Sequence, residues 1–112
     1  LQQDGLPNAY IEVKNVTLKG PNEMALFPDS VSTRGQKHLR DLIKIKEAGH
    51  RAIMLYLVNR SDVNSFAPAA DIDPEYTRLL KAANKAGVEI LAYQTEITTE
   101  YIKVNKKVDI QL

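Results

Sequence analysis

The stretch Ala-Tyr-Ile-Glu-Val-Lys-Asn-Val-Thr-Leu, residues 9–18, decides the fold class because its apolar and charged side chains alternate. Ile11 and Val13 fall on one side of the alternation, and Glu12 and Lys14 fall on the other. A period of two with β-branched residues is typical of a strand. Since residues two apart leave the same face of a strand, the stretch predicts a carboxylate and an ammonium group held side by side.

A helix is predicted after this strand, over residues 32–48. Ser32 or Thr33 can act as its N-cap, and Gln36 stands at capping-box spacing from Thr33. Gly49 suits the position after the helix end. The residues expected to face the core are Leu39, Leu42 and Ile43.

Two further strands and a second helix follow. Residues 52–58 are continuously apolar and predict a central strand covered on both faces. Asp73 can cap a helix that has Pro74 at its first position and ends at Gly87. Residues 88–93 predict the next strand.

The remaining segments give weaker signals. Residues 24–27 fit a short edge strand, residues 59–72 read as a loop, and the tail predicts a weak hairpin of residues 101–104 and 108–110. The order strand, helix, strand, helix, strand indicates one α/β domain with a mixed sheet and mostly parallel neighbours.

Composition narrows the class of protein. The chain has 112 residues, 44% of them hydrophobic, which suits one small core. It contains no cysteine, no membrane-length apolar run and no visible signal peptide, so we expect a cytoplasmic protein. The first residue is not methionine, which favours a fragment. Net charge is only +1, so any nucleic-acid binding must depend on local charge, which is most basic from Arg34 to Arg51.

Glu12 and Lys14 are the residues with the clearest chemical potential. A carboxylate can hold a hard cation such as Mg²⁺, and a neighbouring ammonium can orient water or stabilise charge on a phosphate. A rigid strand suits both tasks. On the Glu-x-Lys motif alone, however, an ordinary ion pair on a half-buried strand is the better explanation.

The surrounding motifs add weight to the chemical interpretation. Three runs occur in order: Tyr-Ile-Glu-Val-Lys-Asn-Val-Thr-Leu (10–18), Phe-Pro-Asp-Ser (27–30) and Thr-Arg-Gly-Gln-Lys-His-Leu-Arg (33–40). Further matches continue to Gly-Val-Glu-Ile-Leu-Ala-Tyr (87–93). From about residue 9 to residue 93 the chain resembles the sugar fermentation stimulation family, and several motifs in register are far more specific than one Glu-x-Lys.

The resemblance implies an N-terminal OB-like domain, absent from this sequence, and a C-terminal restriction-endonuclease-like domain of the PD-(D/E)xK type. In that pattern Glu12 and Lys14 are catalytic, and Glu12 and the Val13 carbonyl bind the metal. The family's upstream aspartate is also absent. Asp29 is a candidate replacement ligand, although a turn-forming role is favoured slightly. We therefore expect an incomplete fragment that binds Mg²⁺ weakly and is inactive alone.

The resemblance also implies DNA binding and a link to the regulation of sugar metabolism. Arg34, Lys37 and His38 look like phosphate contacts at a helix start, where backbone N–H groups favour anions. A solvated basic face explains them equally well. We expect binding that tolerates different DNA sequences.

The function predicted is DNA binding by a nuclease-like domain, with metal-dependent phosphodiester hydrolysis left open for the intact parent protein. One alternative is a DNA-binding regulator without catalytic activity. The other is a small α/β interaction domain that uses Tyr56, Tyr76 and Tyr93 as core or contact residues.

Overall fold

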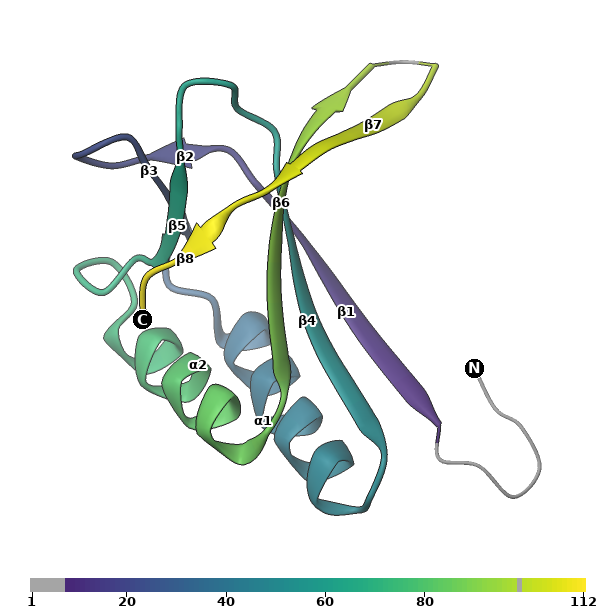
Figure 1. Cartoon of the computed structure of the whole chain (residues 1–112). Helices are drawn as coiled ribbons and strands as arrows, with labels where there is room; N and C mark the ends of the chain where they lie inside the picture. The colour runs from purple at the N-terminus through teal and green to yellow at the C-terminus, as the bar shows by residue number, and fades with distance from the viewer. Residues whose placement is uncertain (1–7, 99) are drawn as a thin grey trace.

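Two sheets and two helices make up the computed structural model, which describes residues 8–98 and 100–112 (Figure 1). The elements are β1 (Ala9–Val16), β2 (Leu18–Lys19), β3 (Met24–Phe27), α1 (Thr33–Glu47), β4 (Arg51–Val58), β5 (Ser65–Pro68), α2 (Pro74–Ala86), β6 (Glu89–Ile97), β7 (Ile102–Lys107) and β8 (Asp109–Ile110). The predicted succession of three long strands separated by two helices is confirmed.

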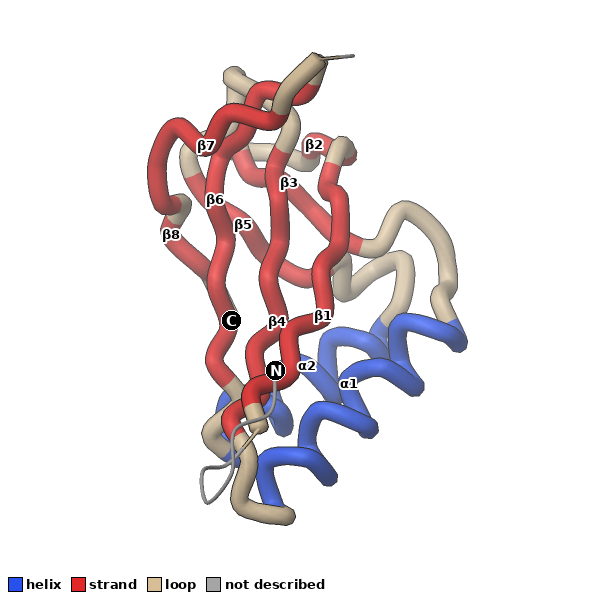
Figure 2. Tube along the Cα trace, turned by 90° about the vertical axis from the view of Figure 1, so that its right-hand side faces the viewer, coloured by secondary structure: helices blue, strands red, loops and turns tan. Residues whose placement is uncertain are grey.

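The larger sheet has the strand order β1-β4-β6-β7. β1, β4 and β6 are parallel, and β7 returns antiparallel beside β6. Both helices lie on one face of this sheet, as Figure 2 shows. Each crossover leads one strand further in the same direction, and right-handed crossovers then place both helices on the same side.

The face of this sheet that points away from the helices is only partly covered, which contradicts one prediction. Leu55 and Leu57 of β4 are half-buried, while Met54 and Tyr56 on the helix side are fully buried. The expectation that residues 52–58 are covered on both faces is therefore wrong for the described residues. A continuous apolar run indicates that both faces of the strand are hydrophobic. It does not show that residues of this chain cover both faces.

The smaller sheet, β2-β3-β5-β8, was largely missed by the sequence patterns. β5 lies inside the predicted loop of residues 59–72, and its Phe66 is fully buried. The tail contains strands near the predicted residues 101–104 and 108–110, but their predicted pairing with each other is wrong. β7 pairs instead with a longer β6, and β8 pairs with β5. Such short strands form by pairing with strands that are distant in the sequence. They therefore show little alternation of apolar and polar residues from which they could be predicted.

Both helices begin where the sequence predicts. Ser32 caps α1, and its hydroxyl accepts a hydrogen bond from the Gly35 N–H at 2.9 Å. Asp73 caps α2, and Gly87 ends it with a φ of 100° that glycine adopts without strain. The capping box is not formed, because the Gln36 side chain donates to Asp73 instead.

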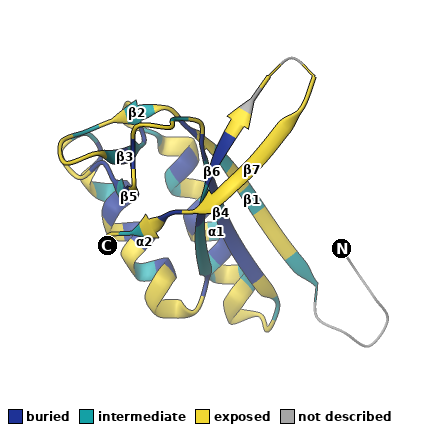
Figure 3. Cartoon of the chain, turned by 45° about the horizontal axis from the view of Figure 1, so that its top comes forward, coloured by how far each residue is buried: buried dark blue, intermediate teal, exposed yellow. Residues whose placement is uncertain are grey.

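Buried residues gather where the helices and the two sheets face one another (Figure 3), and the largest of their side chains are aromatic. Tyr56 and Tyr76 are fully buried, and their hydroxyls form a hydrogen bond of 2.5 Å. The rings of Tyr56 and Phe66 stack with their centroids 4.2 Å apart. In contrast, every residue of β7 is exposed.

Neither helix in the described residues combines the length and apolar character needed to cross a membrane.

Candidate functional site

Three polar side chains meet between β1 and α1 and form what we call the edge-strand cluster: Glu12, Lys14 and His38. Nζ of Lys14 lies 2.8 Å from Nδ1 of His38 and 3.6 Å from Oε1 of Glu12. Nδ1 of His38 lies 3.1 Å from the same Glu12 oxygen. The prediction that Glu12 and Lys14 leave one face of a strand is confirmed. That His38 joins them was not predicted.

The edge-strand cluster contains a competition for one ring nitrogen. An ammonium can only donate, so Nδ1 of His38 must accept a hydrogen bond from Lys14. A carboxylate can only accept, so the same Nδ1 must carry a proton to bond to Glu12. One nitrogen cannot do both at once. The cluster therefore has two alternative hydrogen-bond arrangements, and a ligand that binds Glu12 would favour one of them.

The cluster remains accessible from outside. The side chains of Glu12, Lys14 and His38 are 35%, 15% and 20% exposed. Glu12 and His38 border a small cavity of about 220 Å³, lined by Tyr10, Ile11, Glu12, His38, Asp41, Leu42 and Ile45. The Glu12 carboxylate can thus receive a ligand without a rearrangement of the core.

A second polar group, which we call the helix-start cluster, holds the N-termini of both helices together. The Asp73 carboxylate, 1% exposed, accepts from the Ser32 N–H at 2.9 Å, the Gln36 amide at 3.0 Å and the Tyr76 N–H at 3.0 Å. Burial opposes ionisation, but these hydrogen bonds together hold the pKa of Asp73 below its ordinary value. This cluster fixes where α1 lies, and so where His38 points.

Tyr76 lies within electrostatic reach of both clusters. Burial raises the pKa of Tyr76 well above its ordinary value. The hydrogen bond with Tyr56 opposes this rise, while the carboxylates of Asp73 and Glu12 add to it. Tyr56 and Tyr76 therefore act as neutral core residues, and of the three tyrosines considered as core or contact residues of an interaction domain only Tyr93 is partly exposed.

The three predicted phosphate contacts do not act as one group in the structure. Arg34 and Lys37 are exposed on the first turns of α1, and Lys37 forms an ion pair of 2.8 Å with Asp41. His38 instead turns toward β1 and the edge-strand cluster. The basic surface of α1 thus borders the cluster through His38.

The predicted metal ligands are only partly brought together. Glu12 and Val13 are neighbours on β1, whereas Asp29 is exposed and borders another small cavity, with Asn15 and Thr17. In residues 8–98 and 100–112, no three His, Cys, Asp or Glu side chains form a group that could hold a metal ion. The metal role of Glu12, Val13 and Asp29 stays a prediction.

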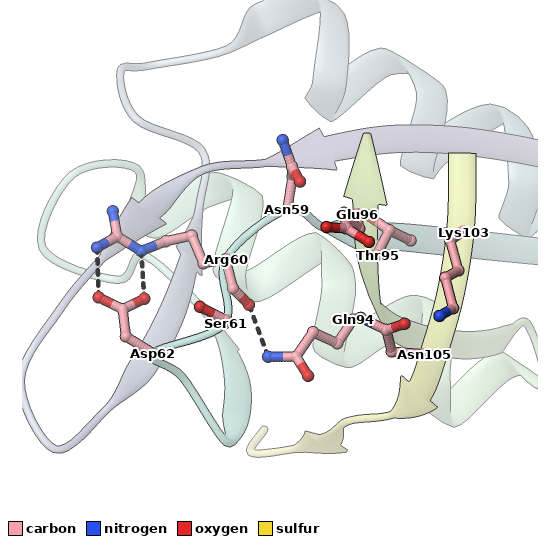
Figure 4. A pocket seen from close by; sticks show the side chains of 9 residues that line it. All are labelled: Asn59, Arg60, Ser61, Asp62, Gln94, Thr95, Glu96, Lys103 and Asn105. Atoms are coloured by element: carbon pink, nitrogen blue, oxygen red, sulfur yellow. Dashed lines mark hydrogen bonds and ion pairs between the residues drawn. The ribbon is translucent and has the colours of Figure 1, made fainter. Parts of the chain in front are cut away.

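A larger polar cavity was missed from the sequence. It lies at the carboxyl ends of β4 and β6 and has a volume of about 720 Å³ (Figure 4). We call it the carboxyl-end groove; its lining residues are Asn59, Arg60, Ser61, Asp62, Gln94, Thr95, Glu96, Lys103 and Asn105. The predicted loop of residues 59–72 contains one wall of this groove, but the loop prediction gave no indication of the other two.

Comparison with known proteins identifies the family. A family model described as "Sugar fermentation stimulation protein RE domain" matches residues 1–101. The chain belongs to the sugar fermentation stimulation family. The chain is 52% identical over 112 residues to a homologue from Roseobacter denitrificans, and 54% identical over 97 residues to one from Dinoroseobacter shibae. It spans 48% and 40% of the lengths of these two curated relatives of the same family.

A solved structure gives the same result for the fold. The structure of Pyrococcus furiosus SfsA in complex with Ca²⁺ is 33% identical, with a TM-score of 0.83. The match covers 91% of this chain and 44% of that chain. The predicted fold class, an α/β restriction-endonuclease-like core, is thereby confirmed for this member of the family.

Proposed function

We propose that this chain is a cytoplasmic, nuclease-like DNA-binding domain that holds a hard divalent cation at Glu12. The observation that carries the proposal is the edge-strand cluster, in which a partly exposed carboxylate and an ammonium stand side by side on a rigid strand. Support also comes from the Pyrococcus furiosus relative, which is described in complex with Ca²⁺. An ordinary surface ion pair would not explain why His38 is drawn into the same contact.

The donors on β1 fit such a cation in part. The Glu12 carboxylate and the Val13 carbonyl are the hard oxygen ligands that Mg²⁺ and Ca²⁺ prefer. When bound, the cation supplies positive charge that polarises a phosphate or a water molecule. Lys14 would orient that water or the phosphate, and His38 would take up the Lys14 hydrogen bond while Glu12 is engaged.

Asp29 bears on whether the domain also cleaves DNA. It borders a cavity different from that of Glu12, so Asp29 cannot join Glu12 as a ligand in this arrangement. Asp41 does border the Glu12 cavity, but its carboxylate forms an ion pair with Lys37. Divalent sites usually take two carboxylates from the protein. We expect weak cation binding and no robust hydrolysis by these 112 residues. The separate position of Asp29 favours, as second candidate, a DNA-binding regulator of sugar metabolism without catalytic activity.

Arg34 and Lys37 supply the proposed contact with duplex DNA. Both are exposed at the start of α1, and phosphate neutralisation by such residues gives affinity that tolerates any base sequence. Binding should be measured by fluorescence anisotropy with a labelled duplex over a range of salt concentrations. We expect weak binding, with Arg34→Ala plus Lys37→Ala lowering the salt slope by roughly 1.8, since each contact contributes about 0.9.

The matched control is Lys81→Ala plus Lys85→Ala, which removes two exposed lysines from α2. This variant has the same change in net charge, so a similar loss in both variants would show bulk attraction and contradict a surface on α1. Circular dichroism would confirm that both variants are folded.

A further inference from the structure

The carboxyl-end groove is separate from the edge-strand cluster and shares no residue with it. Its walls come from the loop after β4 (residues 59–62), the end of β6 (residues 94–96) and β7. Figure 4 shows these side chains around one recess. In open α/β sheets, ligands bind outside the carboxyl ends of the strands, which is where this groove lies.

The loop wall of the groove is held in place by side-chain hydrogen bonds. Arg60 donates to Asp62 through Nε at 2.8 Å and Nη2 at 2.7 Å, and its Nη1 donates to the Thr17 carbonyl at 3.1 Å. The Gln94 amide donates to the Arg60 carbonyl at 2.6 Å. The wall is therefore preorganised, and the charge of Arg60 is already neutralised.

Thr95 lines the groove with a hydroxyl group that forms no hydrogen bond to the described residues. Its side chain is 4% exposed, and its hydroxyl is buried without a hydrogen-bond partner among the described residues. Leaving a buried hydroxyl unpaired costs about 1–3 kcal/mol, so such groups usually have a partner. A polar group bound in the groove would supply that partner.

The charged and polar side chains of the groove indicate which kind of ligand group would bind there. Lys103 and Glu96 stand opposite each other on β7 and β6, but no ion pair joins them in the described part of the chain. Ser61 and Asn105 add a hydroxyl and an amide. Lysine, serine, threonine and asparagine side chains are the usual contacts of nucleic-acid phosphates and sugars.

We propose that the carboxyl-end groove binds the phosphodiester backbone of a single nucleic-acid strand. Lys103 pairs with a phosphate, and Thr95 and Asn105 donate to its oxygens. Glu96 accepts a hydrogen bond from the amino group of an unpaired base, as carboxylates do with cytosine. This inference rests on the DNA-binding function proposed above, and it assigns that function a second surface.

The hairpin of β6 and β7 extends this surface beyond the groove (Figure 1). Lys103 and Lys106, which stand opposite Glu96 and Gln94 of the groove, make this side of β7 basic, and no acidic residue occurs between 102 and 107. Tyr101, 51% exposed beside β7, offers a ring on which a base can stack. A basic track with an aromatic platform is the usual arrangement for single-strand binding.

The test uses the 112-residue chain and a labelled 12-nucleotide oligocytidine DNA, titrated by anisotropy at several salt concentrations. Lys103→Ala should weaken binding several-fold and lower the salt slope by about 0.7, the contribution of one phosphate contact on a single strand. Thr95→Val should weaken binding without lowering the melting temperature, because the hydroxyl lost has no partner inside the protein. Lys85→Ala on α2 is the matched control and should change neither quantity.

The outcomes separate this inference from the function on which it rests. If Lys103→Ala and Thr95→Val bind the single strand like wild type, while duplex binding still depends on Arg34 and Lys37, the groove is not a nucleic-acid site and the proposed function stands. If wild type binds neither form of DNA, the proposed function itself falls, and the inference falls with it. If inorganic phosphate at matched ionic strength displaces the strand completely, the groove is a site for free phosphate, which also overturns the proposal.

Discussion

The two polar clusters along α1 are built from similar groups but are satisfied to different degrees. In the helix-start cluster, Asp73 is buried, and donors from Ser32, Gln36 and Tyr76 all point at its oxygens. In the edge-strand cluster, Glu12 and Lys14 compete for one nitrogen of His38 and stay partly exposed. A fully satisfied cluster stabilises one structure, whereas a cluster with unmet hydrogen bonds is prepared for a ligand.

The largest expected effect is on the helix-start cluster. Asp73→Ala removes the N-cap of α2 and leaves the Ser32 and Tyr76 N–H groups without their acceptor. We expect a loss of roughly 3 kcal/mol in the free energy of unfolding, measured by urea denaturation. Asp41→Ala, which removes a partly exposed carboxylate of α1, should change little. An equal loss in both variants would contradict a special role for Asp73.

The acid stability of the chain should reveal the same carboxylate. The pKa of Asp73 is lowered from its ordinary value of 3.8, so the folded state binds the proton more weakly than the unfolded state. Its stabilisation is therefore present above about pH 4 and is lost as the pH falls through the folded pKa. The difference in unfolding free energy between wild type and Asp73→Asn should be constant near neutral pH and shrink in acid. A difference in unfolding free energy that stays constant down to pH 2 would falsify the assignment of this acid sensitivity to Asp73.

The smallest expected change in stability belongs to the edge-strand cluster. Glu12→Gln should alter the free energy of unfolding by less than about 1 kcal/mol, because partly exposed ion pairs contribute little. The same variant should abolish the weak Mg²⁺ or Ca²⁺ response of the His38 imidazole signals in NMR titrations. Glu47→Gln, at the exposed end of α1, is the matched control. Equal cation responses in wild type and Glu12→Gln would place the cation elsewhere.

The parts of this structure that could be predicted are those with a local pattern. Alternation placed Glu12 and Lys14 on one face of β1, and cap residues fixed both ends of each helix. The contact of His38 with Lys14 could not be predicted, because 24 residues separate them and the rotation of α1 depends on packing. Gln36 shows the same limit, since its predicted local role gave way to a partner 37 residues away.

The carboxyl-end groove was missed for a related reason. Its walls come from three segments that only the topology brings together, and no sequence pattern connects these segments with one another. β5 and the partner of β8 were missed because strands of four and two residues are held by their partners rather than by their own propensity. The resemblance to a family identified the fold class, but it could not supply these contacts.

The position of β1 at the edge of its sheet has a consequence for folding. Each residue of β1 pairs with the residue 42 positions later in β4, after the whole of α1 has been inserted between them. Closing so long a loop carries a large entropic penalty, and parallel pairings of this kind form slowly. Glu12 and Lys14 therefore meet His38 only when β1 and α1 have both packed against β4, so the candidate site depends on long-range pairing rather than on a local segment.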